Sequence, residues 1–223
     1  MRISKFLFAM GLPLALAACG DSQKLPFARA FEPAPDANAA LEPKRTDVSL
    51  AGGALNVQGP NGFCVSSNGL KTRANGSFAI LARCDLLGQS RQSEGQPRAV
   101  ITVTTAPSAE PAPDAQALAG LVPGAEVLQT AGDAEFPLAL FSGAPKVSEL
   151  VSAVHWRGSF SHNGQLVLLS LYAPEGSPAL DSEGADILSA VANKTRAAST
   201  IQRPKGAAAN RPPLLRRVGG LID

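Results

Sequence analysis

Three side chains that could bind an anionic ligand are predicted to share one face of a β-hairpin: His155, Arg157 and Tyr172. The hairpin is indicated by Asn163-Gly164 between two apolar-rich segments, because both residues of a tight turn must accept positive φ. This register places His155 opposite Tyr172, with Arg157 two residues further along the same face. A guanidinium beside an imidazole and a phenol could hold a carboxylate or a phosphate through paired hydrogen bonds.

The rest of the sequence supplies no recognisable catalytic partner for these side chains. A general base needs an orienting partner and a nucleophile or metal within reach. The chain contains no Gly-x-Ser-x-Gly elbow, no Ser-x-x-Lys, no His-Glu-x-x-His and no glycine-rich phosphate loop. We therefore expect no catalytic residue, no metal site and no cofactor. Two alternatives to a ligand site stay open: a hydrolytic site on the same three side chains, and a half-hydrated polar sheet face without a ligand.

The same hairpin also predicts the core of the domain. In the expected register one face is wholly apolar, while the three polar candidates lie on the other face with two serines and two leucines. A slip of one residue would exchange the two sets, so the pattern itself supports the register. The core face consists of Trp156, Phe160, Val167, Leu169 and Leu171.

Further strands and two helices must position this hairpin. Strands are expected at residues 48–57, 63–66, 77–84, 98–106 and 136–141. The β-branched run at 98–106 indicates a central strand. Asp114 is expected to cap a short helix through Leu121, and Ser182 is expected to cap a longer helix to about Ala198. The predicted fold class is α+β: a single domain with a mainly antiparallel sheet and packed helices, one of them C-terminal.

The N-terminus carries the most specific motif of the chain, Leu16-Ala17-Ala18-Cys19. Arg2 and Lys5 precede an apolar run at residues 6–16, which as a helix spans roughly 16 Å and is too short for a bilayer core of ~30 Å. This pattern resembles the signal peptide and lipobox of bacterial lipoproteins. The resemblance implies cleavage before Cys19, lipid on Cys19 and a place on the periplasmic side of a bacterial membrane, inner or outer. The alternative is an ordinary secretory signal that is followed by a cysteine by chance.

The other two cysteines, Cys64 and Cys84, suit an oxidising compartment. An even pair there predicts a disulfide. Closing a loop of about 20 residues contributes ~3 kcal/mol in the chain-entropy model. A metal site is a poorer interpretation, because the chain has no Cys-x-x-Cys and only two histidines.

Composition divides the chain into four expected parts. These are a signal peptide (1–18), a lipidated cysteine with a Pro/Ala-rich tether (19–46), the α+β domain (47–199) and a basic disordered tail (200–223). The chain has 20 Lys and Arg against 18 Asp and Glu, and loss of Arg2 and Lys5 with the signal balances them. From Lys194 onward, however, seven basic residues stand against one acid. Such a tail could meet an envelope protein, an anionic lipid or peptidoglycan, or could simply keep the chain soluble.

The order of strands, short helix, hairpin and final helix is loosely similar to the sandwich fold of PsbP and Mog1-like proteins, and this similarity implies fold alone. A membrane-anchored envelope lipoprotein is the expected function, with a non-catalytic binding or scaffolding domain. The alternative is a periplasmic domain that binds or hydrolyses a small anionic ligand through His155, Arg157 and Tyr172. Nucleic acid is not an expected partner outside the cytoplasm.

Overall fold

The computed structural model of the chain describes residues 31, 40–73, 75–92, 95–143 and 146–199. The expected signal peptide (1–18), Cys19 and the expected tail (200–223) therefore lie outside the described residues. No helix among the described residues is long and apolar enough to cross a membrane. The expected single α+β domain with a mainly antiparallel sheet and a C-terminal helix is confirmed.

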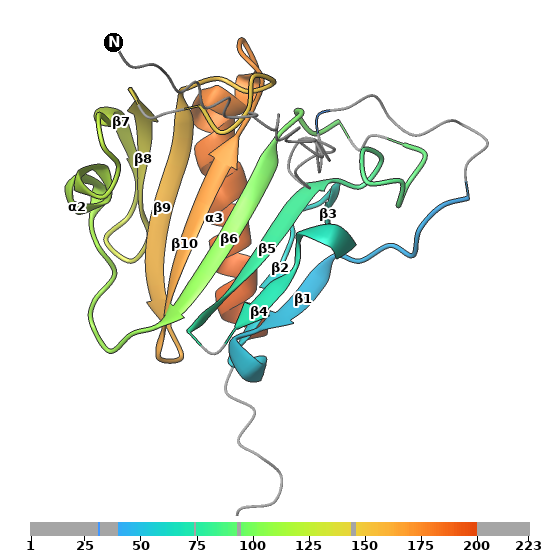
Figure 1. The fold of residues 1–223 in the computed structure, drawn as a ribbon, viewed down its shortest axis with the longest axis horizontal. Coiled ribbons are helices and arrows are strands. Elements are labelled where there is room, and N and C mark those ends of the chain that lie inside the picture. Colours follow the sequence, from blue (N-terminus) through green and yellow to red (C-terminus); the bar gives the residue numbers. More distant parts are fainter. Residues whose placement is uncertain (1–30, 32–39, 74, 93–94, 144–145, 200–223) are drawn as a thin grey trace, which may run out of the picture.

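One large antiparallel sheet forms the centre of the domain (Figure 1). Its strands run in the order β3-β5-β6-β10-β9-β8-β7, and β4 also pairs with β5. The β-branched segment is the central strand β6, between β5 and β10, as the sequence predicts. The strands are β3 (Phe63–Val65), β4 (Lys71–Arg73), β5 (Gly76–Arg83), β6 (Val100–Pro107), β7 (Glu126–Gly132), β8 (Pro137–Ser142), β9 (His155–His162) and β10 (Gln165–Tyr172).

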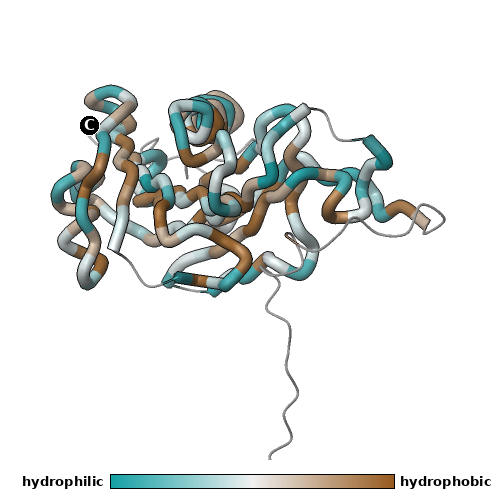
Figure 2. Tube along the Cα trace, turned by 90° about the horizontal axis from the view of Figure 1, so that it is seen from above, coloured by the Kyte–Doolittle hydropathy of each residue, from teal (hydrophilic) through white to brown (hydrophobic). Residues whose placement is uncertain are grey.

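The helix α3 (Ser182–Ala198) covers one face of this sheet, which we name the helix side (Figures 1 and 2). A separate hairpin of β1 (Asp47–Leu50) and β2 (Leu55–Gln58) completes the cover, since α3 packs against β2 as well as β9 and β10. The apolar stripe of α3 and the core face of the β9–β10 hairpin meet in one cluster with Trp156 at 0 % exposure. The buried residues of α3 are Gly184, Ala185, Ile187, Leu188, Val191, Ala192 and Thr195.

The opposite face, which we name the open side, is covered only in part. The short helix α2 (Ala115–Gly120) packs against β7, β8 and β9 at one edge, where Leu118 contacts a cluster with Ala139 and Phe141. Near the other edge a second cluster contains Phe31 and Val151. The middle strands between these two clusters carry the side chains singled out in the sequence.

Sequence and structure differ in a few elements. The expected cap of α3 was one residue off: Asp181 is the N-cap, and its side chain makes no capping hydrogen bond. Asp114 caps α2 as predicted, accepting a hydrogen bond from the amide of Ala117 at 2.8 Å. The sequence does not predict strands β4 and β7. Strand β4 is short and exposed along its whole length, and strand β7 is mostly exposed, with its Leu128 side chain 55 % exposed to solvent.

Candidate functional site

The hairpin has the predicted register. Gln165 pairs with His162 and Leu171 with Trp156. The turn residues Asn163 and Gly164 have φ of 50° and 71°, the left-handed values that a two-residue hairpin turn requires. The polar candidates are therefore on the open side.

His155 lies at the start of β9 and is almost fully buried, with 3 % exposure. Its ring stacks on Tyr172 with centroids 4.9 Å apart and planes 23° apart. Phe141 lies on β8 with its ring centroid 6.1 Å from the imidazole. The imidazole is therefore part of an aromatic layer, whereas Arg157 and Ser170 on the same face are half-buried.

Both ring nitrogens of His155 are hydrogen-bonded. Arg157 Nε donates to His155 Nε2 at 2.9 Å, and His155 Nδ1 lies 3.1 Å from the carbonyl oxygen of Ala153. An arginine Nε–H can only donate, so Nε2 carries the lone pair. The proton of a neutral ring then resides on Nδ1 and is donated to Ala153.

Burial fixes this neutral state. It lowers the pKa of His155 from 6.5 to about 4, while the hydrogen bond to Ala153 opposes the shift and the charge of Arg157 adds to it. His155 is thus an uncharged acceptor near neutral pH. Its function in this geometry is to hold the Nε edge of Arg157.

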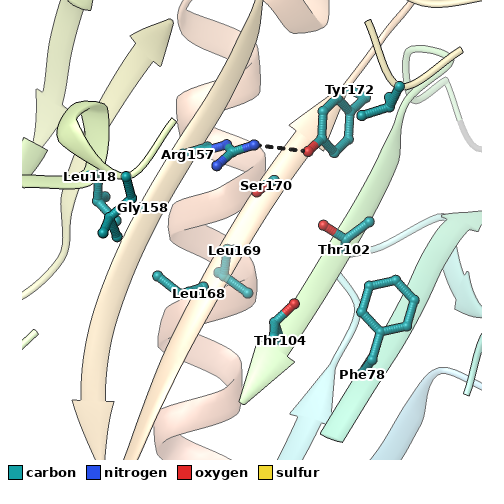
Figure 3. A pocket seen from close by; sticks show the side chains of 12 residues that line it. Phe78, Thr102, Thr104, Leu118, Arg157, Gly158, Leu168, Leu169, Ser170 and Tyr172 are labelled. Atoms are coloured by element: carbon teal, nitrogen blue, oxygen red, sulfur yellow. Dashed lines mark hydrogen bonds between the residues drawn. The ribbon is translucent and has the colours of Figure 1, made fainter. Parts of the chain in front are cut away.

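Arg157 also donates a hydrogen bond to Tyr172, with its Nη2 3.4 Å from the phenol oxygen (Figure 3). The two contacts fix the guanidinium over the neighbouring strands, and its side chain remains half-buried. Along the sheet Arg157 is paired with Ser170, which is paired with Thr102. Arginine, serine and threonine therefore form one polar row across three strands of the open side.

This row forms the floor of a hollow of about 370 Å³ (Figure 3). That volume is within the range of small-molecule sites. Arg157 and Tyr172 line one end, while Phe78 lines the hollow from β5 and Leu118 from α2. The remaining lining residues are Thr102, Thr104, Leu121, Val147, Gly158, Leu168, Leu169 and Ser170.

The segment between β6 and α2 closes one end of the open side. Ser159 Oγ donates to the carbonyl oxygen of Pro113 at 2.6 Å, and Ser161 Oγ donates to that of Glu110 at 3.2 Å. Ser159 is fully buried. Its hydroxyl is thus used to hold a loop in place.

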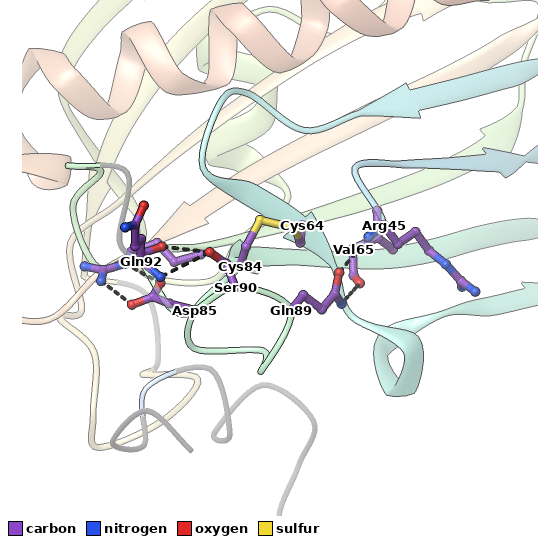
Figure 4. Close-up of a disulfide and its surroundings, with 9 residues drawn as sticks. Arg45, Cys64, Val65, Cys84, Asp85, Gln89, Ser90 and Gln92 are labelled. Atoms are coloured by element: carbon purple, nitrogen blue, oxygen red, sulfur yellow. Dashed lines mark hydrogen bonds and ion pairs between the residues drawn. A yellow bond between two sulfur atoms is a disulfide. The ribbon is translucent and has the colours of Figure 1, made fainter. Parts of the chain in front are cut away.

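Cys64 and Cys84 form a disulfide, with Cα atoms 4.8 Å apart (Figure 4). The bond joins β3 to the end of β5, two strands that the structure pairs directly. Next to it, Gln89 Nε2 donates to the carbonyl oxygen of Val65 at 2.9 Å, and Gln89 Oε1 accepts from the amide of Arg45 at 2.7 Å. None of these residues lines the hollow, so the disulfide braces the fold away from the site.

The structure brings His155, Arg157 and Tyr172 together as the sequence predicts, but it gives them unequal positions. Arg157 and Tyr172 line the hollow, whereas His155 supports them from behind. The sequence did not indicate Phe78, Leu118 or the other apolar walls, because they come from elements far apart in the chain. Thr102 and Ser170 could have been found from the alternation of β6 and β10, once the pairing of these strands was known. Cys19 lies outside the described residues.

No protein-family model and no curated protein sequence matches the chain. Among solved structures, a mutant of the protein Mog1 matches with a TM-score of 0.45 and 16 % identity, over 66 % of this chain and 93 % of that one. The solution structure of cyanobacterial PsbP (CyanoP) from Synechocystis sp. PCC 6803 matches with a TM-score of 0.33 and 11 % identity, over 73 % and 95 %. These values express a loose likeness of fold and carry no information about activity or partners.

Proposed function

We propose that the chain is a lipid-anchored protein of the bacterial cell envelope whose domain is a non-catalytic binding module. Its ligand is a small molecule or group with an anionic end and an apolar part, and it binds in the hollow of the open side. The anchor is the lipid on Cys19, which follows from the lipobox resemblance. The observation that carries the binding function is the position of Arg157, a cation held in place at one end of a largely apolar hollow.

Pre-orientation of Arg157 supports binding of an anion. A guanidinium that is already fixed loses less side-chain entropy when it binds. Because Nε is engaged by His155, the Nη atoms are the edge that can face a ligand. A carboxylate or phosphate would accept from them in the paired geometry that arginine favours.

The surroundings of Arg157 support an apolar body for this ligand. Leu118, Leu168 and Phe78 line the hollow from three different elements. Thr102, Thr104 and Ser170 supply hydroxyl groups between them. A few polar groups in a mainly apolar wall are typical of sites for small organic molecules.

The chemistry of His155 favours binding over hydrolysis. A general base needs a free lone pair and a pKa near the working pH. His155 has its lone pair occupied by Arg157 Nε and a pKa of about 4. The hydrolytic alternative would require the imidazole to break a contact that orients the arginine.

Binding of octanoate tests this function. The probe has a carboxylate and a short apolar chain, and 1-octanol serves as its uncharged counterpart. In a chain that begins at residue 19 with Cys19→Ser, octanoate should shift the backbone amide resonances of Thr102 and Ser170. Arg157→Gln should weaken octanoate at least about tenfold and leave 1-octanol unchanged, since a hydrogen bond to a charged group contributes roughly 1.5–3 kcal/mol.

Lys194→Gln is the matched control, because it removes a cation from α3 on the helix side. This variant should bind octanoate like the wild-type chain. Equal octanoate affinity in wild type and Arg157→Gln would contradict the proposal. Amide shifts confined to the helix side would contradict it as well.

A further inference from the structure

We infer that the ligand of the hollow is an anionic lipid of the same membrane that holds the Cys19 anchor. Its headgroup would meet Arg157, and the upper part of one acyl chain would lie along the apolar wall. The inference rests on the proposed anchor and binding function. Three features of the structure carry it: the attachment of Phe31, the exposed apolar rim and the single charge of the lining.

Phe31 packs on the open side beside the hollow. Its side chain is 7 % exposed and is part of a cluster with Val100, Val151 and Tyr172. Arg98 Nη2 donates to the Phe31 carbonyl oxygen at 3.3 Å. Tyr172 is thus shared, because it contacts the Phe31 cluster and also lines the hollow.

The attachment shortens the free connection to the membrane. The sequence alone suggests a tether up to residue 46, which as a flexible chain has an end-to-end distance of roughly 25–30 Å. Only twelve residues lead from Cys19 to Phe31, so this part of the chain reaches at most ~42 Å. In the proposed arrangement, this short connection between the anchor and Phe31 keeps the open side and its hollow close to the bilayer.

The rim of the hollow carries exposed apolar side chains. Leu121 and Val147 line the hollow with 67 % and 43 % of their surface exposed, and Leu150 in the same loop as Val147 is 48 % exposed. These are three of the five large apolar residues that are exposed in the described part of the chain. A rim of this kind is expected where a protein contacts an apolar partner.

Charge selects the class of lipid. Among the described residues that line the hollow, Arg157 alone is charged. A zwitterionic headgroup would bring its own cation next to the guanidinium, whereas an anionic headgroup gives a matched pair. A phosphatidylglycerol-like lipid fits better than phosphatidylcholine.

Paramagnetic relaxation in nanodiscs tests the inference. The lipidated chain is inserted into discs of phosphatidylcholine and phosphatidylglycerol that contain a trace of lipid spin-labelled near the headgroup end of its acyl chain. Amide resonances of Thr102 and Ser170 on the open side should relax several-fold faster than those of Asn61 and Lys194 on the helix side. Omission of phosphatidylglycerol, or the variant Arg157→Gln, should abolish most of this difference.

Phe31→Ala tests whether the packing of Phe31 on the open side orients the hollow toward the membrane. This variant should keep its folded spectrum and its octanoate affinity. It should lose most of the difference in paramagnetic relaxation between amides of the open side and amides of the helix side. Leu41→Ala is the matched control, because Leu41 belongs to the same segment and is 46 % exposed; it should behave like wild type.

Equal relaxation of both sides in the wild-type discs would overturn the lipid inference, and so would faster relaxation of the helix side. If octanoate still bound through Arg157, the binding function would survive and only the membrane lipid as its ligand would be wrong. Failure of octanoate binding in addition would contradict both proposals.

Discussion

At the scale of single residues, the informative contact is the one between His155 and Arg157. A buried histidine beside an arginine looks unfavourable if both are drawn as cations. The structure avoids the conflict because the imidazole is neutral and accepts from Arg157 Nε at 2.9 Å. The residue types suggested a possible base, whereas the geometry makes His155 a positioning residue for the guanidinium.

The depressed pKa of His155 makes the domain less stable in acid. The unfolded chain takes up a proton near pH 6.5 and the folded chain only near pH 4. Between these values the unfolded state binds more protons, so the free energy of unfolding rises with pH and is fully developed above about 6.5. Urea unfolding should show a loss of roughly 2 to 3 kcal/mol from this group between pH 7 and about pH 4.5.

His155→Phe should remove this part of the pH dependence while it keeps an aromatic ring against Tyr172 and Phe141. His162→Gln, which removes the only other histidine, should retain the wild-type difference between the two pH values. An unchanged pH dependence in His155→Phe would show that the neutral imidazole is not its source.

At the scale of elements, the docking of α3 depends on a glycine. Gly184 lies in the first turns of the helix, directly over the indole of Trp156. A Cβ at this position would lie 2.6 Å from Trp156 Cδ1 and would meet the carbonyl oxygen of Ala179. The indole Nε1 meanwhile donates to the carbonyl oxygen of Asp181 at 2.9 Å, which ties the start of the helix to β9.

Gly184→Ala is therefore expected to destabilise the domain. At an exposed helix position the same change stabilises by about 1 kcal/mol, but overpacking here should cost roughly 1–3 kcal/mol. Urea unfolding gives the sign directly. The comparison is Gly120→Ala in α2, where the position is exposed and an added Cβ meets nothing within 4 Å, so this change should stabilise the domain by up to about 1 kcal/mol. A gain in stability for Gly184→Ala would contradict the close contact between α3 and Trp156.

At the scale of the whole molecule, the two faces of the sheet are covered to different extents. The helix side buries the main core under α3 and the β1–β2 hairpin. The open side is covered at its edges and leaves the hollow between them. The disulfide, Gln89 and the amide of Glu42, which donates to Gly88 at 2.9 Å, hold the start of the domain in place. The stable layer therefore lies behind the surface that is proposed to bind.

The proposed anchor belongs to this scale, because it would determine which surfaces the open side can meet. Cys19→Ser should move the protein from the membrane fraction to the soluble fraction of fractionated cells, since in our proposal acyl chains on Cys19 supply the stable attachment. Ser22→Ala, next to the anchor, should leave the distribution unchanged. A Cys19→Ser protein that still sediments with membranes would contradict lipidation as the anchor.

The sequence by itself determined the local features of this protein. The Asn163-Gly164 turn fixed the register of the hairpin, and alternation then placed Trp156 in the core and Arg157 on the other face. These predictions succeed because they need only neighbouring residues and the two-residue period of a strand.

Only the tertiary structure decided what the site is. Burial made His155 neutral, and burial depends on the packing of β8, β9 and β10 together. The hollow exists because Phe78, Leu118 and Val147 line it from three distant parts of the chain, and the packing of Phe31 depends on a surface formed by other strands. Contacts between residues so far apart in the chain have no local pattern, so the sequence alone could place Arg157 on the right face without showing what surrounds it.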